Sequence, residues 1–461
     1  MNVKKVTAPW RRLAALLAPG ELQTDLSARE QHASDKWFAS HLPEAVALPR
    51  STAAVAKILR FAATHKIPVT ARGAGYGYVG GCIPSRGGIA LSLFRMNRIK
   101  EIHRGDFVAV VQPGVITQQL QEAVEKQGLF YPPDPASRAD CSLGGNIATN
   151  AGGPRCLKYG VTRDYVLGLE VALAGGEIVR LGGRTHKNKT GFDLVRLFTG
   201  SEGLLGVVTE ATLKLLPLPP FRACLAIGFD RMRLAAQSIR EIFAAGFLPC
   251  ALEIADDFTL TAARKRTGSR RLDGCRALIF VELDGQNSSV RQEILEVEKI
   301  VRRLKPVFVD RALGDAECEK LWHLRREFSY ALRDTGLTKL NEDIVVPRSR
   351  LEELFHFAAR LQRRHGLPIA CFGHAGDGNI HVNVMTDFGE PGARRRSDAA
   401  LDDLFREILK MDGVITGEHG IGLAKKKWWP LAVSAPARRL HQDIKNALDP
   451  AGILNPGKFL P

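Results

Sequence analysis

Two histidines separated by a short glycine-rich segment are the residues of this sequence best suited to binding a metal ion. His374 and His381 flank residues 375–380, and apolar, strand-like residues continue on both outer sides. If residues 376–379 form a turn, His374 falls opposite His381 in a β-hairpin, with both side chains on one face about 5 Å apart. Strand alternation adds Asn383 to that face. The spacing therefore predicts a divalent metal held by two imidazoles, since imidazole nitrogen is a common metal ligand.

A third ligand is expected from residues 416–422, which read TGEHGIG. Glu418 and His419 are neighbours, and neighbouring side chains of an extended backbone point apart, so we do not expect both to serve the same atom. Two histidines and one carboxylate would leave a coordination position open, as catalytic metal sites require and closed structural sites do not. Zn, Mn and Fe all accept such ligands.

Three glycine clusters in the first half of the chain could cradle phosphate groups. They are residues 72–81 (RGAGYGYVGG), 142–153 and 200–206. The first contains a G-x-G-x-x-G spacing, but residues 82–88 lead into another strand and not into the helix that a Rossmann loop requires. Bare backbone N–H groups of such loops bind phosphate oxygens without a helix, and Arg72 adds a positive charge. Together the clusters favour a large phosphorylated cofactor.

The charge balance also favours an anionic ligand. The 65 Lys and Arg residues exceed the 49 Asp and Glu residues, for a formal net charge of +16. Such a balance suits an anionic cofactor, an anionic substrate or an acidic docking surface. The basic clusters at 264–271 and 425–427 lack the interleaved aromatic residues of a nucleic-acid channel, so no nucleic-acid partner is expected. With 45% hydrophobic and 25% charged residues, the composition excludes the disordered and membrane-spanning classes.

The eight cysteines form no C-x-x-C pair. This spacing argues against an iron–sulfur cluster in the chain and indicates a reducing, cytoplasmic compartment, with peripheral association at the inner face of the membrane as the alternative. The apolar run at residues 13–18 follows Lys4, Lys5, Arg11 and Arg12. It is shorter than the ~20 residues that cross a bilayer, so we expect a first amphipathic helix and not a targeting signal.

The elements that must position these residues differ before and after residue 220. Up to the proline cluster at 217–220, short β-branched segments (67–71, 89–93, 108–111 and 167–173) alternate with glycine loops and two helices (52–65 and 116–127). Later, longer helices alternate with strands such as 277–283 and 368–373. In 288–304 the apolar residues recur three or four apart, as in an amphipathic helix: Val290, Ile294, Val297, Val301 and Leu304. The predicted class is α+β.

Five motifs occur along the chain in a specific order and spacing: RGAGYGYVGG from Arg72, PPDP from Pro132, CSLGGNIATNAGG from Cys141, YG at Tyr159 and GSEGLLGV from Gly200. Together they resemble the FAD-linked oxidases and dehydrogenases of the vanillyl-alcohol oxidase type, in particular the glycolate oxidase flavin subunit and the D-lactate and D-2-hydroxyglutarate dehydrogenases. The resemblance covers nearly the whole chain. It implies a two-lobed FAD-binding domain (1–219), an α+β, ferredoxin-like cap domain that binds substrate and metal (220–425), and a C-terminal segment (426–461) that returns to the FAD domain.

By this resemblance the glycine clusters would hold FAD. The first loop would bind the pyrophosphate, residues 142–152 would line the flavin and ribityl chain, and residues 206–208 would lie beside the adenine. Related enzymes with covalent flavin carry a histidine in the first loop, where this chain has Ala74, so noncovalent FAD is expected. The implied FAD contacts are Arg72, Gly73, Ala74, Gly75, Tyr76, Gly77, Pro132, Asp134, Ser142, Gly144, Gly145, Asn146, Asn150, Gly152, Gly206, Val207 and Val208.

The resemblance also implies roles in catalysis. It assigns His374, His381 and Glu418 to the metal and His419 to abstraction of the substrate hydroxyl proton. Arg325 would bind the substrate carboxylate through two parallel hydrogen bonds. Further substrate contacts are implied for Asn383, for Ser329, and for Lys339 as the alternative to Asn341 at the family's lysine position. The expected reaction oxidises a small, D-configured, lactate- or glycolate-like 2-hydroxy acid to the 2-oxo acid, with hydride passing to the flavin.

Electrons must then leave the flavin for an external acceptor, because the cysteine spacing offers no cluster within the chain. A quinone, an iron–sulfur partner subunit or oxygen would each serve. Two other function classes use some of the same residues. A zinc-dependent hydrolase could use the histidines and Glu418 to activate water, but the glycine clusters would then have no role. A noncatalytic nucleotide-binding module would leave the paired histidines unexplained.

Overall fold

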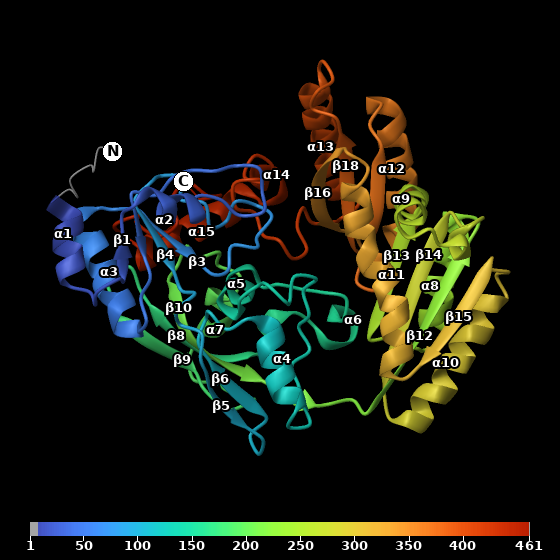
Figure 1. Ribbon diagram of the computed structural model, residues 1–461, viewed down its shortest axis with the longest axis horizontal. Coiled ribbons are helices and arrows are strands. Elements are labelled where there is room, and N and C mark those ends of the chain that lie inside the picture. Colours follow the sequence, from blue (N-terminus) through green and yellow to red (C-terminus); the bar gives the residue numbers. More distant parts are fainter. Residues whose placement is uncertain (1–7, 461) are drawn as a thin grey trace. The chain divides into compact units, whose positions relative to one another are not determined.

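A computed structural model describes residues 8–460, in which the chain folds into two compact units (Figure 1). The first unit comprises residues 8–152, 161–218 and 418–460, and the second comprises residues 153–160 and 219–417. The basic residues Lys4 and Lys5 lie outside the described part of the chain. No helix within residues 8–460 is long and apolar enough to cross a membrane. The domain ranges 1–219, 220–425 and 426–461 stay a prediction; the compact units assign residues 153–160 to the second unit and 418–425 to the first.

The smaller sheet of the first unit has the strand order β1-β2-β4-β3 (Leu22–Gln23, Ala45–Ala47, Ile89–Ser92 and Val69–Arg72). β2 and β3 both run parallel to β4. Helix α3 (Thr52–His65), predicted with these bounds, packs its apolar face into the core beneath this sheet. It begins where the Ser51 side chain accepts the Ala54 N–H at 3.2 Å, an N-cap that satisfies one otherwise unpaired donor. No helix lies within residues 73–88, so the G-x-G-x-x-G spacing does not form a Rossmann loop.

The larger sheet of the first unit is antiparallel throughout. Its order is β5-β6-β10-β8-β9 (Ile99–His103, Val108–Val111, Val207–Lys214, Val166–Ala172 and Ile178–Gly182). The two sheets correspond to the two expected lobes. The other elements of this unit are short: α1 (Ala8–Ala15), α2 (Leu26–Gln31), α4 (Thr117–Glu125), α5 (Leu143–Thr149), α7 (Leu194–Phe198), α14 (Trp429–Ala432), and β7 (Leu129–Phe130) paired with β11 (Leu216–Pro217).

The end of the chain packs into the first unit. After α15 (Ala435–Leu448), the Val69 N–H of β3 donates to the Ile453 carbonyl at 2.8 Å, and the Asn455 N–H donates to the Val69 carbonyl at 2.7 Å. The buried Lys445 ammonium donates to the carbonyls of Leu204 and Leu454, both at 2.8 Å. A buried lysine needs such acceptors to offset its lost hydration. These contacts hold residues 449–455 beside β3.

The second unit is built on one antiparallel sheet of seven strands in the order β15-β12-β14-β13-β17-β18-β16. The strands are, in chain order, β12 (Phe221–Phe229), β13 (Ala251–Asp256), β14 (Ala277–Gly285), β15 (Phe308–Leu313), β16 (Thr338–Val345), β17 (Ile369–His374) and β18 (Asn379–Thr386). The first four, numbered in chain order, lie in space as 4-1-3-2 with helices after the first and third, and a further helix at residues 257–267 is inserted between the second and third. This β-α-β-β-α-β arrangement is ferredoxin-like, as expected.

Two helical layers cover this sheet. One layer contains α8 (Met232–Ala244), α10 (Asn287–Arg302), α12 (Leu351–His365) and α13 (Ala393–Lys410). The other contains α9 (Asp257–Thr267) and α11 (Asp315–Arg333). The amphipathic helix predicted at 288–304 is α10, and four of its five predicted core residues, Val290, Ile294, Val297 and Val301, are buried. Leu304 lies beyond the end of the helix at Arg302 and is only partly buried, so that part of the prediction is wrong. The periodicity was therefore sufficient to locate the buried face.

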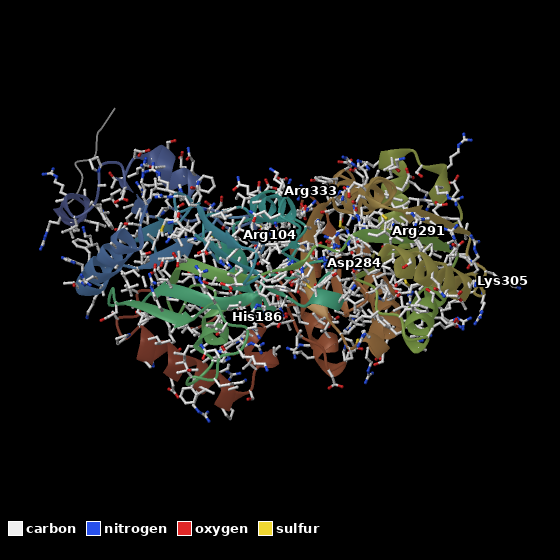
Figure 2. All side chains as sticks on the ribbon, turned by 90° about the horizontal axis from the view of Figure 1, so that it is seen from below. Arg104, His186, Asp284, Arg291, Lys305 and Arg333 are labelled. Carbon is white, nitrogen blue, oxygen red and sulfur yellow. The ribbon has the colours of Figure 1, made fainter. Side chains whose placement is uncertain are left out.

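Residues 153–160 lie in the sequence between two segments of the first unit, but they pack in the second unit. They contain the short helix α6 (Cys156–Tyr159). The Tyr159 hydroxyl donates to Asp284 Oδ2 at 2.8 Å, and Lys158 Nζ lies 2.6 Å from Asp284 Oδ1. Arg155 pairs with the buried carboxylate of Glu282 at 3.2 Å. The YG motif at Tyr159 thus serves as part of an anchor on β14, at Asp284, which is labelled in Figure 2.

Candidate functional site

The two candidate metal-binding histidines lie on one face of the β17–β18 hairpin, with ring centroids 5.7 Å apart. The turn spans residues 375–378, so His374 pairs with Asn379 and His381 pairs with Phe372. The expectation that His374 faces His381 directly is wrong by two residues of register. Because side chains alternate with a period of two, a shift of two residues keeps both rings on the same face. Gly378 makes this turn possible, since its φ is +88° and a Cβ there would lie 2.0 Å from the Val346 carbonyl oxygen.

Two fully buried polar residues flank His381 on the same sheet face. Asn383, two residues along β18, donates from Nδ2 to the carbonyls of Ala370 and His381. Asp343 of β16 pairs directly with His381. Its carboxylate accepts the Thr416 hydroxyl and the Gly417 N–H, at 3.0 and 2.9 Å to Oδ2. Asp343 therefore fixes the segment that leads into Glu418.

Within residues 8–460, one group of side chains has the residue types and spacing of a metal site. His374, His381 and Glu418 each offer one ligand atom, and these atoms lie within 4.8 Å of one another. Glu418 directly follows Gly417, whose N–H donates to Asp343, so this hydrogen bond restrains the position of the Glu418 backbone. Two imidazoles and one carboxylate form a donor set that suits a divalent transition metal.

A buried glutamate that the sequence analysis missed lies behind His374. Glu253 of β13 pairs with His374 across the sheet, and its Oε1 lies 2.6 Å from His374 Nδ1. Its Oε2 accepts Arg325 Nε at 2.7 Å. Burial alone would raise the pKa of Glu253, but the adjacent charges of His374 and Arg325 outweigh it and lower the pKa to about 2. A charged residue inside the otherwise apolar strand ALEIA was the sequence signal for this position.

The candidate substrate residues lie on α11 and β16. Arg325 and Ser329 are one helical turn apart on α11, and Lys339 Nζ lies 2.9 Å from Ser329 Oγ. Burial, and then the nearby Arg333 charge, lower the pKa of Lys339 to about 8. Asn341 pairs with Asn383 across β16 and β18, so Lys339 and Asn341, two residues apart on one strand, face the same side. Lys339 and Asn341, the two alternatives for the family's lysine position, therefore lie on the same face of the sheet as His381.

His419 lies in the first unit beside the first glycine cluster. Its ring centroid is 5.1 Å from that of Tyr78. His419 Nε2 is 3.6 Å from Glu418 Oε1, although we expected the two side chains to point apart. The backbone bends at residues 417–419 and is not extended there, which corrects that expectation.

The three glycine clusters converge in the first unit. Gly73 of the first cluster approaches Ser142 of the second so closely that a Cβ at Gly73 would lie 2.3 Å from Ser142 Oγ. The N–H groups of Gly200 and Glu202, in the third cluster, donate to carbonyls of α5, each at 2.8 Å. The partly buried Glu202 carboxylate in turn accepts the N–H groups of residues 421 and 422, both at 2.8 Å. Burial raises the pKa of Glu202 above its ordinary value.

The first cluster has the properties of a phosphate-binding loop. Among the described residues, the N–H groups of Gly75, Tyr76 and Gly77 have no hydrogen-bond acceptor, whereas the Ala74 N–H donates to Ser142 Oγ at 3.1 Å. Unused N–H groups in a glycine loop suit phosphate oxygens. Arg72 lies beneath the loop and donates to the Ser34 carbonyl at 2.7 Å. The loop therefore fits the pyrophosphate of FAD, with Arg72 as its support.

The other expected FAD contacts line the same loops or follow them in sequence. Asn146 Nδ2 donates to Thr117 Oγ1 at 2.6 Å, and Asn150, at φ 52°, accepts the Arg163 N–H at 2.8 Å. A Cβ at Gly206 would meet Val171 at 2.6 Å. Of the remaining positions, the buried ones are Pro132, Gly152 and Val207, and the partly exposed ones are Asp134, Gly144, Gly145 and Val208.

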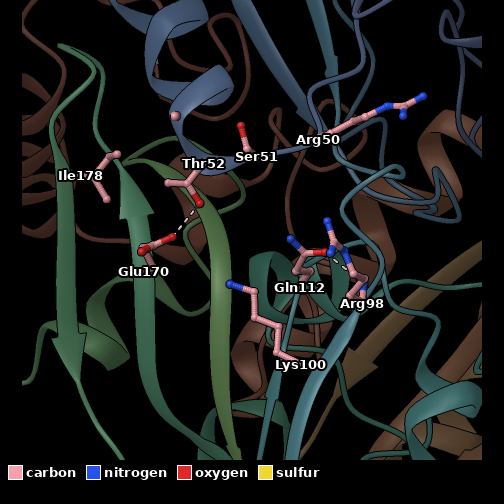
Figure 3. A pocket seen from close by; sticks show the side chains of 9 residues that line it. Arg50, Ser51, Thr52, Arg98, Lys100, Gln112, Glu170 and Ile178 are labelled. Carbon is pink, nitrogen blue, oxygen red and sulfur yellow. Dashed lines mark hydrogen bonds between the residues drawn. The ribbon is translucent and has the colours of Figure 1, made fainter. Parts of the chain in front are cut away.

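A separate pocket of about 560 Å³ lies in the first unit around the N-terminus of α3 (Figure 3). Thr52 Oγ1 donates to Glu170 Oε1 at 2.6 Å on one side, and Gln112 accepts the Arg98 N–H at 3.1 Å on the other. None of the candidate site residues lines it. We therefore assign it no part in the candidate chemistry.

Comparisons with known proteins agree with this geometry. Residues 218–459 match a family model described as "FAD linked oxidases, C-terminal domain", and residues 43–182 match one described as "FAD binding domain". The chain is 39% identical over 418 residues to the glycolate oxidase subunit GlcD of Bacillus subtilis (strain 168), covering 91% of this chain and 89% of that protein. It is 35% identical over 428 residues to a D-lactate dehydrogenase of Anaerostipes hadrus, covering 90% and 89%.

Solved structures agree on the fold. A p-cresol methylhydroxylase superposes with a TM-score of 0.79 at 18% identity, covering 99% of this chain and 98% of that one. An alkyldihydroxyacetonephosphate synthase superposes with a TM-score of 0.76 at 20% identity, covering 99% and 87%. At such low identity these matches establish the architecture, which is the vanillyl-alcohol oxidase type of FAD-binding fold.

Proposed function

Because the chain belongs to the FAD-linked oxidase family and carries its FAD-binding domain, we propose that it oxidises a small 2-hydroxy acid to the 2-oxo acid. The relatives named glycolate oxidase subunit and D-lactate dehydrogenase support a lactate- or glycolate-like substrate of D configuration. The observation that carries the proposal is the pair of buried imidazoles on one sheet face, beside a partly buried arginine, Arg325. A carboxylate and a hydroxyl on adjacent carbons would be held by such a set.

His374, His381 and Glu418 would hold a divalent metal, with Zn, Mn and Fe as the candidates. When bound, the metal would supply a Lewis acid for the substrate hydroxyl, and noncovalent FAD would supply a two-electron acceptor for the hydride from C2. The chain's own residues bind and orient the acid. Arg325 uses Nε and one Nη2 hydrogen for Glu253, which leaves Nη1 and the second Nη2 hydrogen to donate two parallel hydrogen bonds to the substrate carboxylate.

Further contacts along the same face would fit the rest of the substrate. Asn383 lies two residues from His381, and the Lys339–Ser329 pair lies beyond it on the neighbouring strand and helix. Lys339 is charged below a pH of about 8, so it would attract an anion under neutral conditions. His419 would take the hydroxyl proton onto its imidazole as C2 is oxidised.

Electrons would then pass to an external acceptor, since none of the eight cysteines forms a disulfide and none belongs to a cluster motif. A quinone, an iron–sulfur partner subunit or oxygen would serve. The net charge of +16, with surface cations such as Arg291 and Lys305 (Figure 2), would assist docking of an acidic partner or peripheral association at the inner face of a membrane from the cytoplasm.

Anaerobic reduction of the flavin tests the proposal directly. The purified holoprotein is mixed with D- or L-lactate or with glycolate, and the flavin absorbance at about 450 nm is followed. We expect bleaching by at least one of these acids. His419→Ala should keep its FAD and metal but reduce the flavin about 10²- to 10⁴-fold more slowly, the usual contribution of a general base. A wild-type flavin that none of these acids bleaches would reject the substrate class, and an unimpaired His419→Ala variant would reject the base.

A further inference from the structure

We propose that Glu253 is a positioning residue that serves both halves of the substrate site, orienting His374 through one carboxylate oxygen and Arg325 through the other. The inference rests on the proposed function, because it assumes that His374 binds a metal and that Arg325 binds the substrate carboxylate. Glu253 is fully buried and bridges two side chains that lie 49 positions apart in the sequence but meet on one sheet face.

The contact with His374 would select one tautomer of the imidazole. Glu253 Oε1 lies 2.6 Å from His374 Nδ1. A carboxylate can only accept, so the proton of this bond belongs to Nδ1 and the lone pair of Nε2 is left for a metal. Direct pairing of Glu253 with His374 across β13 and β17 holds both groups on rigid strands. A carboxylate behind a ligating histidine is the arrangement that fixes ring orientation and raises ligand basicity.

The second oxygen fixes the arginine. Glu253 Oε2 accepts Arg325 Nε at 2.7 Å, and Arg325 Nη2 lies 2.5 Å from the same oxygen. The guanidinium also lies over the rings of Phe372 and Phe328, at 4.9 and 5.6 Å from their centroids. These contacts fix the plane of the guanidinium. The charge of Arg325 also neutralises the Glu253 carboxylate, which is buried away from solvent.

The chain offers a matched control on the same sheet face. Glu282 of β14 is 1% exposed and pairs with Arg155 and Arg222, with distances of 3.2 and 3.3 Å. It is thus a buried, doubly paired glutamate like Glu253, but its hydrogen-bonding side chains are those of Arg155, Arg222, Cys224, Cys250 and Trp322, and none of them is a histidine. Glu282→Gln removes the same charge from the same sheet without touching the candidate metal ligands.

The test compares Glu253→Gln with Glu282→Gln in the FAD-loaded protein. After treatment with a chelator, each variant is titrated with Mn²⁺, and free Mn²⁺ is measured by electron paramagnetic resonance. We expect Glu253→Gln to bind Mn²⁺ about 10- to 100-fold more weakly than wild type, the usual effect of removing such a partner, while its FAD content stays at one per chain. Glu282→Gln should bind Mn²⁺ as wild type does. In steady-state kinetics at saturating Mn²⁺, KM for the acid should rise for Glu253→Gln, because Arg325 has lost the group that orients it.

Wild-type Mn²⁺ affinity in Glu253→Gln, or an equal loss in Glu282→Gln, would overturn the inference and leave the proposed function standing. If wild type binds neither Mn²⁺ nor Zn²⁺, the metal role in the proposed function fails, and the inference fails with it. Should Glu253→Gln not fold, Glu253→Asp replaces it, since this variant keeps the charge but withdraws the carboxylate by one methylene from both partners. The same loss of Mn²⁺ affinity is expected there, and unchanged affinity would again overturn the inference.

Discussion

Replacing Gly73 by alanine should weaken FAD binding by separating two glycine clusters. A Cβ at Gly73 would lie 2.3 Å from Ser142 Oγ, whereas ordinary contact begins at 3.4 Å, so the two loops must move apart by about 1 Å. Ser142 is 1% exposed, it occupies the N-cap position of α5, and its hydroxyl accepts the Ala74 N–H at 3.1 Å, which leaves it little freedom to move. The backbone of Gly73 itself would tolerate alanine, because its φ is not in the left-handed region. The expected effect is therefore a packing effect and not backbone strain.

The size of the effect follows from the forced separation. Inserting a methyl group into a packed contact costs about 1–3 kcal/mol, and 1.4 kcal/mol corresponds to a tenfold change in affinity. If FAD requires the closed arrangement of the loops, Gly73→Ala should raise the FAD dissociation constant by about 10- to 100-fold. Ser142→Ala alone should cost less, about 1 kcal/mol, because it removes only the acceptor of the Ala74 N–H.

Calorimetric titration of the apoprotein with FAD measures these effects, and a double-mutant cycle isolates their cause. Ser142→Ala removes the atom that Gly73→Ala would strike, so the double variant should bind FAD more tightly than the sum of the single effects predicts. Gly183→Ala is the control, since no atom lies within 4 Å of a Cβ there. Wild-type FAD affinity in Gly73→Ala, or strict additivity in the cycle, would refute the reasoning.

Two further predictions concern the second unit. The pKa of Lys339 is lowered to about 8, so this lysine loses its charge as pH rises through 8, and the wild-type KM for the acid should rise over the same range. Lys339→Met should have a higher KM that does not change with pH in this range. An identical pH profile of KM in the two proteins would exclude Lys339 from substrate binding. Val297 of α10 is fully buried, so Val297→Ala should lower the free energy of unfolding, measured by chemical denaturation, by about 2 kcal/mol. Leu295 is exposed on the same helix, so Leu295→Ala should change the free energy of unfolding by less than about 0.5 kcal/mol.

Local patterns in the sequence were sufficient for several elements. The helix at 52–65 has an N-cap serine and a buried apolar face, and the spacing of Val290, Ile294, Val297 and Val301 located the core side of α10. The absence of a helix after the first glycine cluster was predictable because a proline and two glycines follow it. These features depend on interactions within one or two turns of the chain, which is why periodicity and capping report them.

The histidine pair was predictable in part. Strand alternation placed His374 and His381 on one face whether the hairpin register was right or shifted by two residues. The expected register was nonetheless wrong, because the turn takes residues 375–378 and not 376–379. The position of the turn depends on where Gly378 can adopt a positive φ beside Val346, a residue that follows β16 and lies 32 positions earlier in the chain.

The tertiary structure alone decided which charged residues meet. Glu253, Asp343 and Arg325 come from three elements. The pairing of β13 with β17 and of β16 with β18 brings Glu253 and Asp343 to the two histidines, and the packing of α11 on the sheet brings Arg325 to Glu253. The sheet also contains a second partial β-α-β-β-α unit, in β16 to α13, that no sequence repeat had indicated. The sequence determined the ligand types, the glycine loops and the face of each strand, because these follow from neighbours along the chain. The partners of buried charges depend on the order of strands in a sheet, and that order is set by packing between segments tens to hundreds of residues apart.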